Sequence, residues 1–394
     1  MSNFAFETIT AAQALAITGS DTLSIAQSTG TATGVTVIYT GDAAGDISVT
    51  FGGQTELFGP GIADLSHTPG SLTFADGSQL YIGDAAANLY NELVFNPLAS
   101  GSPAAAFGGD GADNLAVNGA RDLLQGNAGD DVLTGNNGDD TIYGGQGNDV
   151  ISVGSGTNFG QGNKGDDTIT GAGSDDTLLG GQGDDKITGA GVLDGNLGND
   201  SVSGSGQLLG EAGDDSLAST GTANSLLVGS DGNDTIASNS TGNDTLSGGN
   251  GDDSIVAGTG ADSITGDAGA DTITVNGHAE RIAGGAGADV FIFNTGTTAV
   301  GTVPGITDWT GSEDKIRFAG FTPNPSDYAA ITDGDYATAV SDATRLITQN
   351  HFTFVAVQIG SDVVIFAGGS GGITSAVDLI GRSLSDFDPH NNLI

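Results

Sequence analysis

Hydrophobic residues recur with a nine-residue period through the middle of the chain, between residues 108 and 292. In each period one large aliphatic side chain stands between small or polar residues, and a glycine-rich segment follows. A strand that buries one face shows this alternation, because successive side chains point to opposite sides. Each nine-residue unit therefore predicts one short strand and one loop. Two units make a turn of eighteen residues, with two parallel sheets and a thin core between them.

The polar positions of the period are equally regular and follow the pattern G-G-x-G-x-D-x-U-x, where U is aliphatic. Full copies occupy residues 144–152, 180–188 and 248–256. Glycine permits positive φ and a close approach of backbone carbonyls to an ion, and aspartate provides the hard carboxylate oxygen that calcium prefers. This repeat is the calcium-binding nonapeptide of parallel β-helices. We therefore expect a calcium-binding β-solenoid.

The spacing sorts the sixth-position acids into two rows of loops. The first row predicts a continuous calcium ladder through Asp113, Asp131, Asp149, Asp167, Asp185, Asp200, Asp215, Asp234, Asp253, Asp271 and Asp289. The second row is patchier and comprises Asp122, Asp140, Asp176, Asp244 and Asp262, with Asn158 and Glu280 at two further positions. Between Asp176 and Asp244 the turns shorten from eighteen residues to fifteen and lose the acidic loop. We expect a one-sided gap in the metal ladder there.

The charge of the repeats explains why metal ions are needed. Residues 108–292 contain 29 acidic and four basic side chains, and the whole chain has a net charge of -41. Stacked turns place like charges roughly 5 Å apart, and each such pair costs about 0.8 kcal/mol even in water. We therefore expect disorder without calcium and folding when several calcium ions bind. The same charge disfavours nucleic acid as a partner, and no apolar stretch predicts a membrane span.

Three parts of an all-β chain are predicted: residues 1–107, 108–292 and 293–394. The first shows strand-like runs separated by Gly and Asp, so we expect a small β-rich domain for capping, assembly or binding. The second is a right-handed parallel β-roll. In the third, aromatic residues return, and the spacing predicts one short helix near 335–348 and a hairpin over 352–366. A solenoid exposes strand edges at its ends, so the third part is predicted to be a mostly-β cap.

The repeats and the segments after them resemble one protein family. Residues 284–293, the segment Ile306-Thr307-Asp308-Trp309 and residues 313–316 are similar to the carboxyl ends of RTX proteins, which Gram-negative bacteria export by type I secretion. Serralysin-type proteases and bacterial surface-layer proteins are among the family members with such ends. The resemblance implies an uncleaved secretion signal within residues 293–394 and the type I secretion machinery as a partner. It also implies a secreted, extracellular or cell-surface protein that folds outside the cell.

No residue pattern predicts catalysis. The zinc-protease sequence His-Glu-x-x-His does not occur, and the absence of cysteine excludes zinc–thiolate sites. Residues 368–372 match G-x-S-x-G, but a nucleophile elbow joins a strand to a helix, and the small residues here predict a loop. Residues 160–165 match G-x-G-x-x-G inside a calcium repeat, without a surrounding βαβ unit. We expect that the protein is not an enzyme.

Two classes of function remain. The first is a secreted calcium-binding structural protein that self-assembles, with copies of itself as partners, into an extracellular layer, filament or biofilm matrix. The alternative is an RTX adhesin or carbohydrate-binding module that acts as a monomer on cell-surface or matrix polysaccharide. Its candidate ligand-binding residues, for which core packing is the competing interpretation, are Tyr39, Phe51, Phe58, Tyr81 and Tyr90.

Overall fold

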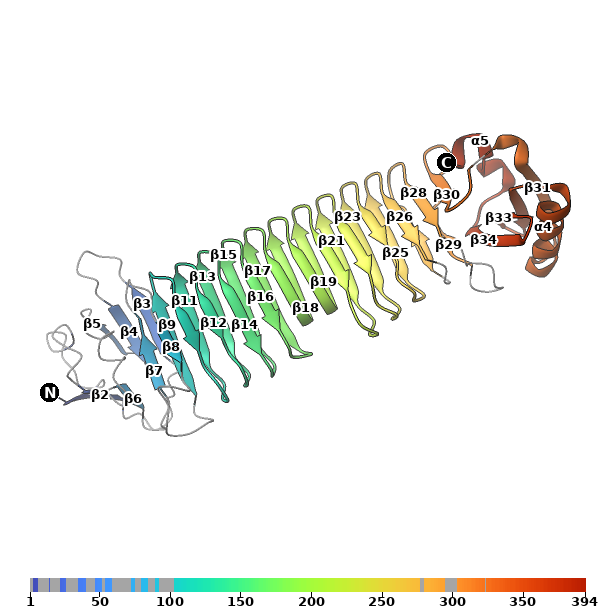
Figure 1. The fold of residues 1–394 in the computed structure, drawn as a ribbon. Coiled ribbons are helices and arrows are strands. Elements are labelled where there is room, and N and C mark those ends of the chain that lie inside the picture. The colour runs from blue at the N-terminus through green and yellow to red at the C-terminus, as the bar shows by residue number, and fades with distance from the viewer. Residues whose placement is uncertain are drawn as a thin grey trace. The chain divides into compact units, whose positions relative to one another are not determined.

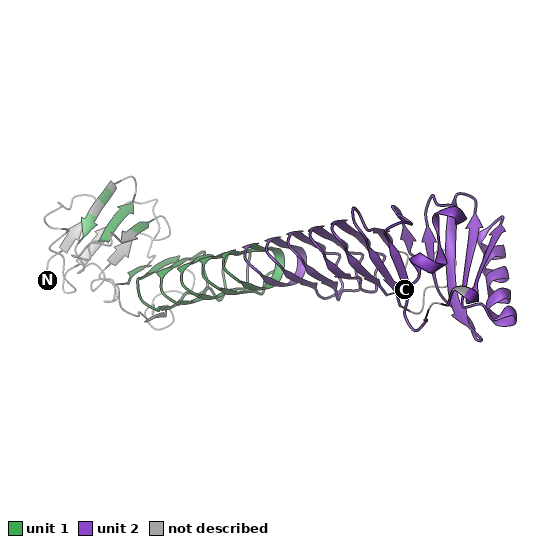
Figure 2. Ribbon diagram, turned by 90° about the horizontal axis from the view of Figure 1, so that it is seen from above, with its two compact units in different colours: residues 1–196 green, residues 197–394 purple. Residues whose placement is uncertain are grey.

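The computed structural model describes residues 103–276, 280–294, 303–322 and 324–394 and shorter segments before residue 103. These segments are residues 3–5, 14, 22–25, 35–39, 47–51, 54–58, 72–74, 79–83 and 89–91. The chain divides into two compact units, residues 1–196 and 197–394 (Figure 2). The all-β fold with a parallel β-roll is confirmed, and each unit contains part of the roll (Figure 1).

Strands also make up most of what is described before residue 103. A three-stranded antiparallel sheet consists of β3 (Thr36–Tyr39), β4 (Ile47–Phe51) and β5 (Gln54–Phe58). Parallel pairs join β1 (Asn3–Ala5), β2 (Thr22–Ile25) and β6 (Leu72–Phe74). The roll is extended by β7 (Gln79–Ile82) and β8 (Leu89–Asn91), which pair in parallel with its first two strands. Phe51, Phe58 and Tyr81 are buried, as core packing predicts, and the side chains of Tyr39 and Tyr90 lie outside the described residues.

In unit 1 the turns of the roll stack two parallel sheets. One sheet contains β9 (Ala104–Gly109), β11 (Leu123–Ala128), β13 (Thr141–Gln146), β15 (Phe159–Lys164) and β17 (Asp176–Gln182). The other contains β10 (Asn114–Ala116), β12 (Val132–Thr134), β14 (Val150–Gly154), β16 (Thr168–Gly171) and β18 (Lys186–Leu197). Leu133, Ile151, Ile169 and Ile187 stack in register and are fully buried. The lone aliphatic residue of each repeat is therefore its core residue.

Unit 2 continues the same construction. Its roll strands are β19 (Ser201–Ala212), β20 (Ser216–Ser219), β21 (Leu226–Asp231), β22 (Thr235–Ser238), β23 (Thr245–Asn250), β24 (Ser254–Val256), β25 (Ser263–Ala268), β26 (Thr272–Val275), β27 (Arg281–Ala283) and β28 (Val290–Phe293). Ile236, Ile255, Ile273 and Phe291 stack in register at the core positions. Burial of such side chains contributes about 1.5–3 kcal/mol each.

The two shortest turns contain the two longest strands. Strands β18 and β19 each run for twelve residues without a break, whereas an ordinary turn places a loop between two separate strands. In β19, residues 201–204 pair with β20 and residues 207–212 pair with β21, so one strand belongs to both sheets. A chain that bends without a loop needs fewer residues, which explains the turns of fifteen residues. The predicted loss of the acidic loop is therefore observed.

The cap follows the last turn within unit 2. Its elements are β29 (Gly305–Ile306), β30 (Lys315–Phe318), η3 (Pro325–Asp327), β31 (Tyr328–Asp333), α4 (Tyr336–Asn350), β32 (Phe354–Ile359), β33 (Asp362–Gly369), β34 (Gly372–Leu379), η4 (Leu384–Asp386) and α5 (Pro389–Asn392). The predicted helix is α4, and the predicted hairpin is β32 and β33. β29 and β30 pair in parallel with β27 and β28, so the cap extends both sheets of the roll.

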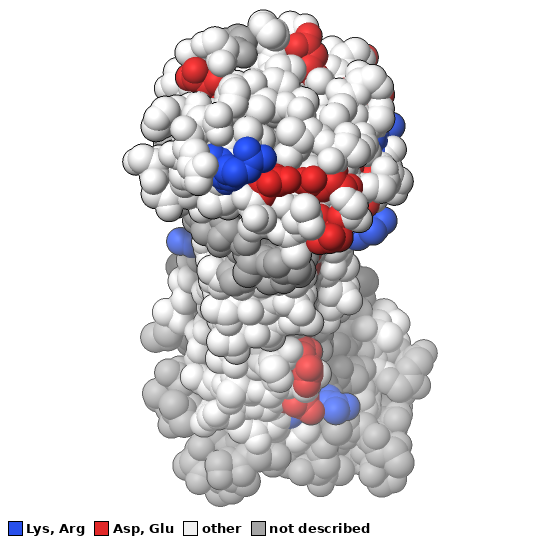
Figure 3. Space-filling model, turned by 90° about the vertical axis from the view of Figure 1, so that its right-hand side faces the viewer, with Lys and Arg blue, Asp and Glu red and all other residues white. Residues whose placement is uncertain are grey.

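The cap has a hydrophobic core of its own. Ala339, Ala343 and Ile347 on one face of α4 pack against buried residues of β32, β33 and β34, among them Val355 and Phe366. Charged side chains of both signs are sparse on the face of this part that Figure 3 turns to the viewer. Among the described residues, no helix is long and apolar enough to cross a membrane.

Candidate metal centre

The predicted ligands are the most buried charged groups of the roll. All sixteen aspartates of the two predicted rows are at most 2% exposed. Their burial follows from the sequence, because each lies two residues before an inward aliphatic residue and alternation turns both to the same side. Ionised carboxylates are costly to bury unless they are paired or bind a metal.

One oxygen of each first-row carboxylate holds neighbouring turns together. In unit 1, the backbone N–H of Asp131 donates to Oδ1 of Asp149 over 2.9 Å, and that of Asp149 donates to Oδ1 of Asp167 over 2.7 Å. In unit 2, Asp215 donates in the same way to Asp234 over 2.8 Å, as does Asp234 to Asp253. The first row is thus a ladder of hydrogen bonds in which Oδ1 of one turn accepts the N–H of the preceding turn.

The other oxygen is available for a cation. Among the described residues, Oδ2 accepts no hydrogen bond in Asp131, Asp149, Asp167, Asp215, Asp234, Asp253 and Asp271. Each of these oxygens lies against the first glycine of its repeat. A Cβ added to Gly126 would collide with Oδ2 of Asp131 and lie 2.6 Å from the carbonyl oxygen of Gly144 in the next turn. Glycine therefore leaves room where a carboxylate oxygen and a carbonyl oxygen of adjacent turns converge.

This donor set fits calcium. Calcium takes several oxygen ligands from carboxylates and backbone carbonyls, and glycine-rich loops present both. The described residues contain no group of three or more His, Cys, Asp or Glu side chains placed to hold a metal, so each ion would have few carboxylates. Oδ2 of the first-row aspartates would hold the ion together with glycine carbonyls. When bound, the ion would neutralise the stacked carboxylates.

Burial raises the pKa of these carboxyl groups, and a bound cation would lower it again. Desolvation raises the pKa of Asp131, Asp149 and Asp215 to about 7, and the neighbouring acids of the row contribute to the increase. Desolvation also raises the pKa of Asp167 and of Asp253 to about 6, with a smaller contribution from the charge of Asp166 to the first and of Asp234 to the second. The row is therefore unfavourable in its fully charged state without a positive charge nearby.

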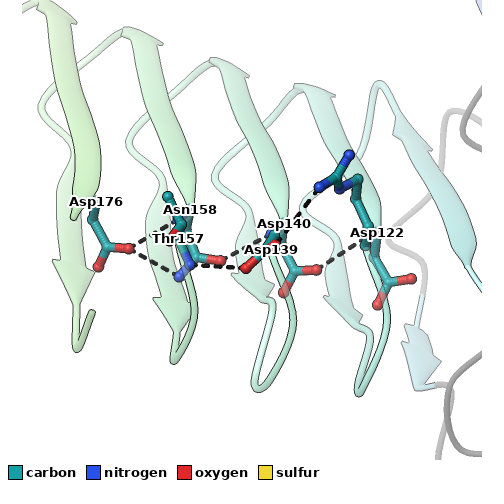
Figure 4. Close-up of polar contacts among 7 residues, drawn as sticks. Asp122, Asp139, Asp140, Thr157, Asn158 and Asp176 are labelled. Atoms are coloured by element: carbon teal, nitrogen blue, oxygen red, sulfur yellow. Dashed lines mark hydrogen bonds and ion pairs between the residues drawn. The ribbon is translucent and has the colours of Figure 1, made fainter. Parts of the chain in front are cut away.

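The second row departs from the first at Asn158 and Asp176, which Figure 4 shows beside Asp122 and Asp140. Asn158 replaces an aspartate and accepts the N–H of Asp140 over 2.9 Å. Asp176 accepts two hydrogen bonds of 3.0 Å from Asn158 at Oδ1 and one of 3.0 Å from the N–H of Gly173 at Oδ2. Both oxygens of Asp176 are thus occupied at the edge of the predicted gap.

Asp244, on the far side of the predicted gap, is surrounded by hydroxyl groups. Its Oδ2 accepts hydrogen bonds from Ser238 at 2.6 Å, Ser240 at 2.8 Å and Ser219 at 3.0 Å. All three serines are at most 3% exposed. Three donors saturate this oxygen, and hydrogen bonding of this kind satisfies a buried carboxylate without a metal. We interpret Asp244 as a hydrogen-bonded substitute for a calcium-binding rung.

A second ladder runs along the exposed side of the first-row loops. Asp130 accepts the N–H of Asn148 over 2.9 Å, and Asp166 accepts that of Asp184 over 3.0 Å. In each Asp-Asp pair the first residue is therefore exposed and the second buried. The two members of a pair therefore have different environments, as alternation along the chain predicts.

One rung was missed from the sequence. Oδ1 of Asp314 accepts the N–H of Asp289 over 3.2 Å, which continues the ladder into the cap. Its Oδ2 accepts the N–H of Thr310 over 2.6 Å. Asp314 follows Asp289 by 25 residues, which is longer than one turn of the roll, so the repeat period does not identify it. The buried Ile316, two residues after Asp314, is the signal that could have revealed it.

The other motifs behave as loops and turns. Residues 368–372 connect β33 to β34, so a strand lies on both sides and the strand-to-helix elbow is missing. Residues 160–165 lie in β15 and its loop, within the roll. Neither segment assembles a site for nucleophilic or nucleotide chemistry.

Comparison with known families agrees with this geometry. The model of the RTX calcium-binding nonapeptide repeat matches residues 107–135, 117–151, 152–187, 219–240, 238–273 and 256–291. The residues between 187 and 219 that it leaves out include most of β18 and β19, where the turns are short. No curated protein matches the chain. The repeats bind multiple calcium ions.

Proposed function

We propose that this RTX calcium-binding repeat protein is secreted, folds on calcium outside the cell and self-assembles into an extracellular layer, filament or matrix. The observation that carries the calcium-dependent step is the row of buried carboxylates whose Oδ2 atoms accept no hydrogen bond, including Asp131, Asp149 and Asp167 among the described residues. Metal binding to such a row is coupled to folding, because the unfolded chain does not hold the ligands together. The RTX resemblance supports export through type I secretion and folding after export.

The outer surface of the roll supports association between copies. Val132 and Val150 stand in register on β12 and β14 and are 40% and 49% exposed. Exposed aliphatic pairs gain free energy when another surface covers them. Asp130, Asp166 and Asp184 are exposed on the loops, and their charge repels other copies. Calcium that screens or bridges these acids would permit contact, so both folding and assembly would depend on the same ion.

Electron microscopy of the refolded full chain tests the proposal, with about 1–10 mM calcium, the range of weak extracellular sites, and with chelator. We expect ordered sheets or filaments with calcium and none with chelator. Isolated particles in calcium, with a folded roll by circular dichroism, would contradict self-assembly and leave the calcium-dependent fold standing.

A pair of double variants locates the contact. Val132→Lys with Val150→Lys places charge on the exposed aliphatic pair and is expected to abolish assembly. The control is Thr235→Lys with Ser254→Lys, at exposed strand positions of β22 and β24 that also stand in register. Equal loss of assembly in both variants would mean that added charge, not this surface, is responsible.

A further inference from the structure

One outward surface of the roll differs from the rest. On β13 and β15, Tyr143 and Phe159 point away from the core, and their ring centroids lie 5.6 Å apart. The corresponding strands of unit 2 carry aliphatic or hydroxyl residues at the position of Tyr143, such as Val228 on β21 and Ser247 on β23. The solenoid core does not require aromatic side chains at outward positions. This pair therefore calls for an explanation other than stacking of the turns.

Strand β3 lies beside this surface, and two hollows remain between β3 and the roll. Val37 of β3 lines a hollow of about 680 Å³ together with Tyr143, Gln125 and Lys164 of the roll. A second hollow of about 380 Å³ lies between Thr36 of β3 and the roll, and Tyr143 lines it too. Tyr143 is therefore shared by two adjoining hollows, which we call the β3 groove.

The lining of the β3 groove combines one aromatic ring with amides and with charged residues of both signs, Asp110 and Lys164 in the larger hollow and Arg121 and Asp122 in the smaller. Asn127, Gln146 and Asn163 line the larger hollow. Gln125 donates to Oδ1 of Asn127 over 2.8 Å, which fixes the orientation of one amide pair. Within the described part of the chain, Gln146 and Asn163 make no side-chain hydrogen bond, and Lys164 makes no ion pair. Donors and acceptors are thus presented around an aromatic ring.

We propose that the β3 groove binds a neutral oligosaccharide. Tyrosine offers a rigid, amphipathic face that can pack on the apolar side of a sugar ring. Amide side chains both donate and accept, as the neighbouring hydroxyl groups of a sugar require. The site would act beside the structural role of the roll and does not depend on self-assembly.

Repetition and charge favour this ligand class over others. Gln125 of β11, Tyr143 of β13 and Gln161 of β15 are register partners, so an amide stands on each side of the ring at the strand spacing of about 4.8 Å. This spacing is close to the length of one sugar unit in an extended chain. The net charge of -41 disfavours acidic polysaccharides. A peptide would need deeper apolar pockets for its side chains.

Titration calorimetry on the calcium-loaded full chain tests the proposal. The probes are neutral hexasaccharides with β-1,4-glucose, α-1,4-glucose and β-1,4-N-acetylglucosamine linkages, beside a hexagalacturonate and a Gly/Ser peptide. We expect binding of at least one neutral hexasaccharide. Tyr143→Ala should weaken it at least about tenfold, the loss expected for a central aromatic contact. Tyr143→Phe should retain most of the affinity, because the ring is kept.

The matched control is Val228→Ala, which alters the outward position on β21 that corresponds to Tyr143. It should leave binding unchanged, and circular dichroism in calcium should be the same for all variants. Binding of none of the neutral hexasaccharides, unchanged binding by Tyr143→Ala, or binding of only hexagalacturonate or the peptide would overturn the proposal. Each of these results would leave calcium-dependent folding and self-assembly untouched, because those are measured separately.

Discussion

The roll and the cap of unit 2 are stabilised in different ways. In the roll, each strand contributes little more than one aliphatic core residue, such as Ile236 or Ile255, and the loops bury Asp234 and Asp253 beside it. In the cap, α4 packs on a sheet of larger side chains, including Val355 and Phe366. Residues 108–292 carry 29 acidic and four basic side chains, whereas residues 303–394 carry eleven and four. Among the described residues, the row of stacked buried acids lies in the roll and reaches the cap only at Asp314.

The comparison leads us to expect a metal-dependent roll and a metal-independent cap in one chain. Hydrophobic burial, at about 25 cal/mol per Å², should stabilise the cap at any calcium concentration. The roll has a thin core and repelling carboxylates, so its stability is conditional on cations. Asp314 lies at their junction, since it accepts the N–H of Asp289 and belongs to the cap. A folded cap would therefore offer the roll its last rung before calcium binds.

Removal of calcium is expected to have the largest effect. In chelator, amides of the roll strands such as β23 and β25 should exchange with solvent, because repulsion along the row is no longer compensated. Amides of α4 and β33 should stay protected. Hydrogen exchange with mass spectrometry on the full chain measures both in one experiment. Equal protection of the roll with and without calcium would refute a cation-dependent roll, and equal loss in the cap would refute its independence.

Substitutions in the buried row should have the next largest effect. Asp131→Asn, Asp149→Asn and Asp167→Asn together keep an oxygen for the ladder hydrogen bond but remove the charged ligand. The calcium concentration at the folding midpoint should rise at least about tenfold, since loss of ligands weakens binding that is coupled to folding. A calcium titration followed by circular dichroism gives the midpoint.

The control removes the same three charges from the exposed ladder, with Asn at Asp130, Asp166 and Asp184. Its midpoint should change little, because these side chains face solvent and pair weakly. A similar shift in both triple variants would mean that net charge, rather than the buried oxygen, sets the calcium requirement.

Much of the roll could be predicted because its determinants are local. The nine-residue period fixes which residue of each repeat faces inward, so the burial of Ile151 and Asp149 follows from alternation alone. The short turns could also be predicted, because the repeat spacing in the sequence falls from eighteen residues to fifteen there. Local repetition of this kind needs no knowledge of long-range contacts.

The rest depends on contacts between residues far apart in the sequence. Ser219, one of the three serines that donate to Asp244, lies 25 residues before it, so this contact could not be predicted from the local sequence. Asp314 was hidden by an irregular spacer, and the parallel pairing of β31 with β32 needs the intervening helix to be placed first. The β3 groove requires an antiparallel strand to lie near Tyr143 of the roll. Tertiary packing, not composition, decides these features.

Acidification should act in opposite directions on the roll with and without calcium. The folded-state pKa of Asp131, Asp149 and Asp215 is about 7, above the ordinary value of 3.8. The folded state therefore binds more protons than the unfolded state between about pH 4 and 7. In chelator, stability should rise as pH falls from 8 to 5. In calcium, the same change should raise the calcium midpoint, because protons compete for the carboxylates. Circular dichroism at both pH values tests this. A loss of folded roll on acidification in chelator, or a lower calcium midpoint at pH 5 than at pH 8, would contradict it.

Asp244 and Asp253 allow a comparison of a hydrogen-bonded rung with a calcium rung. Asp244→Asn should lower the free energy of unfolding at saturating calcium by about 2 kcal/mol, because it weakens charge-assisted hydrogen bonds from three serines. Its calcium midpoint should change less than that of Asp253→Asn, whose Oδ2 accepts no hydrogen bond in the described structure. Chemical denaturation and calcium titration of both variants provide the two quantities. A larger midpoint shift for Asp244→Asn would make Asp244 a calcium ligand after all.

The smallest effect concerns one backbone position of the calcium loops. Glu211 has a φ of 74°, in the left-handed region, where Asn127, Asn163 and Asn196 stand in the equivalent position of other turns. Asparagine tolerates this region better than glutamate, so Glu211→Asn should raise the free energy of unfolding in calcium by about 0.5–1 kcal/mol. Glu211→Gln removes the charge without changing the backbone preference, so the difference between the two variants isolates the strain. Equal stability of both variants by thermal denaturation would mean that charge, not the left-handed conformation, limits stability at this turn.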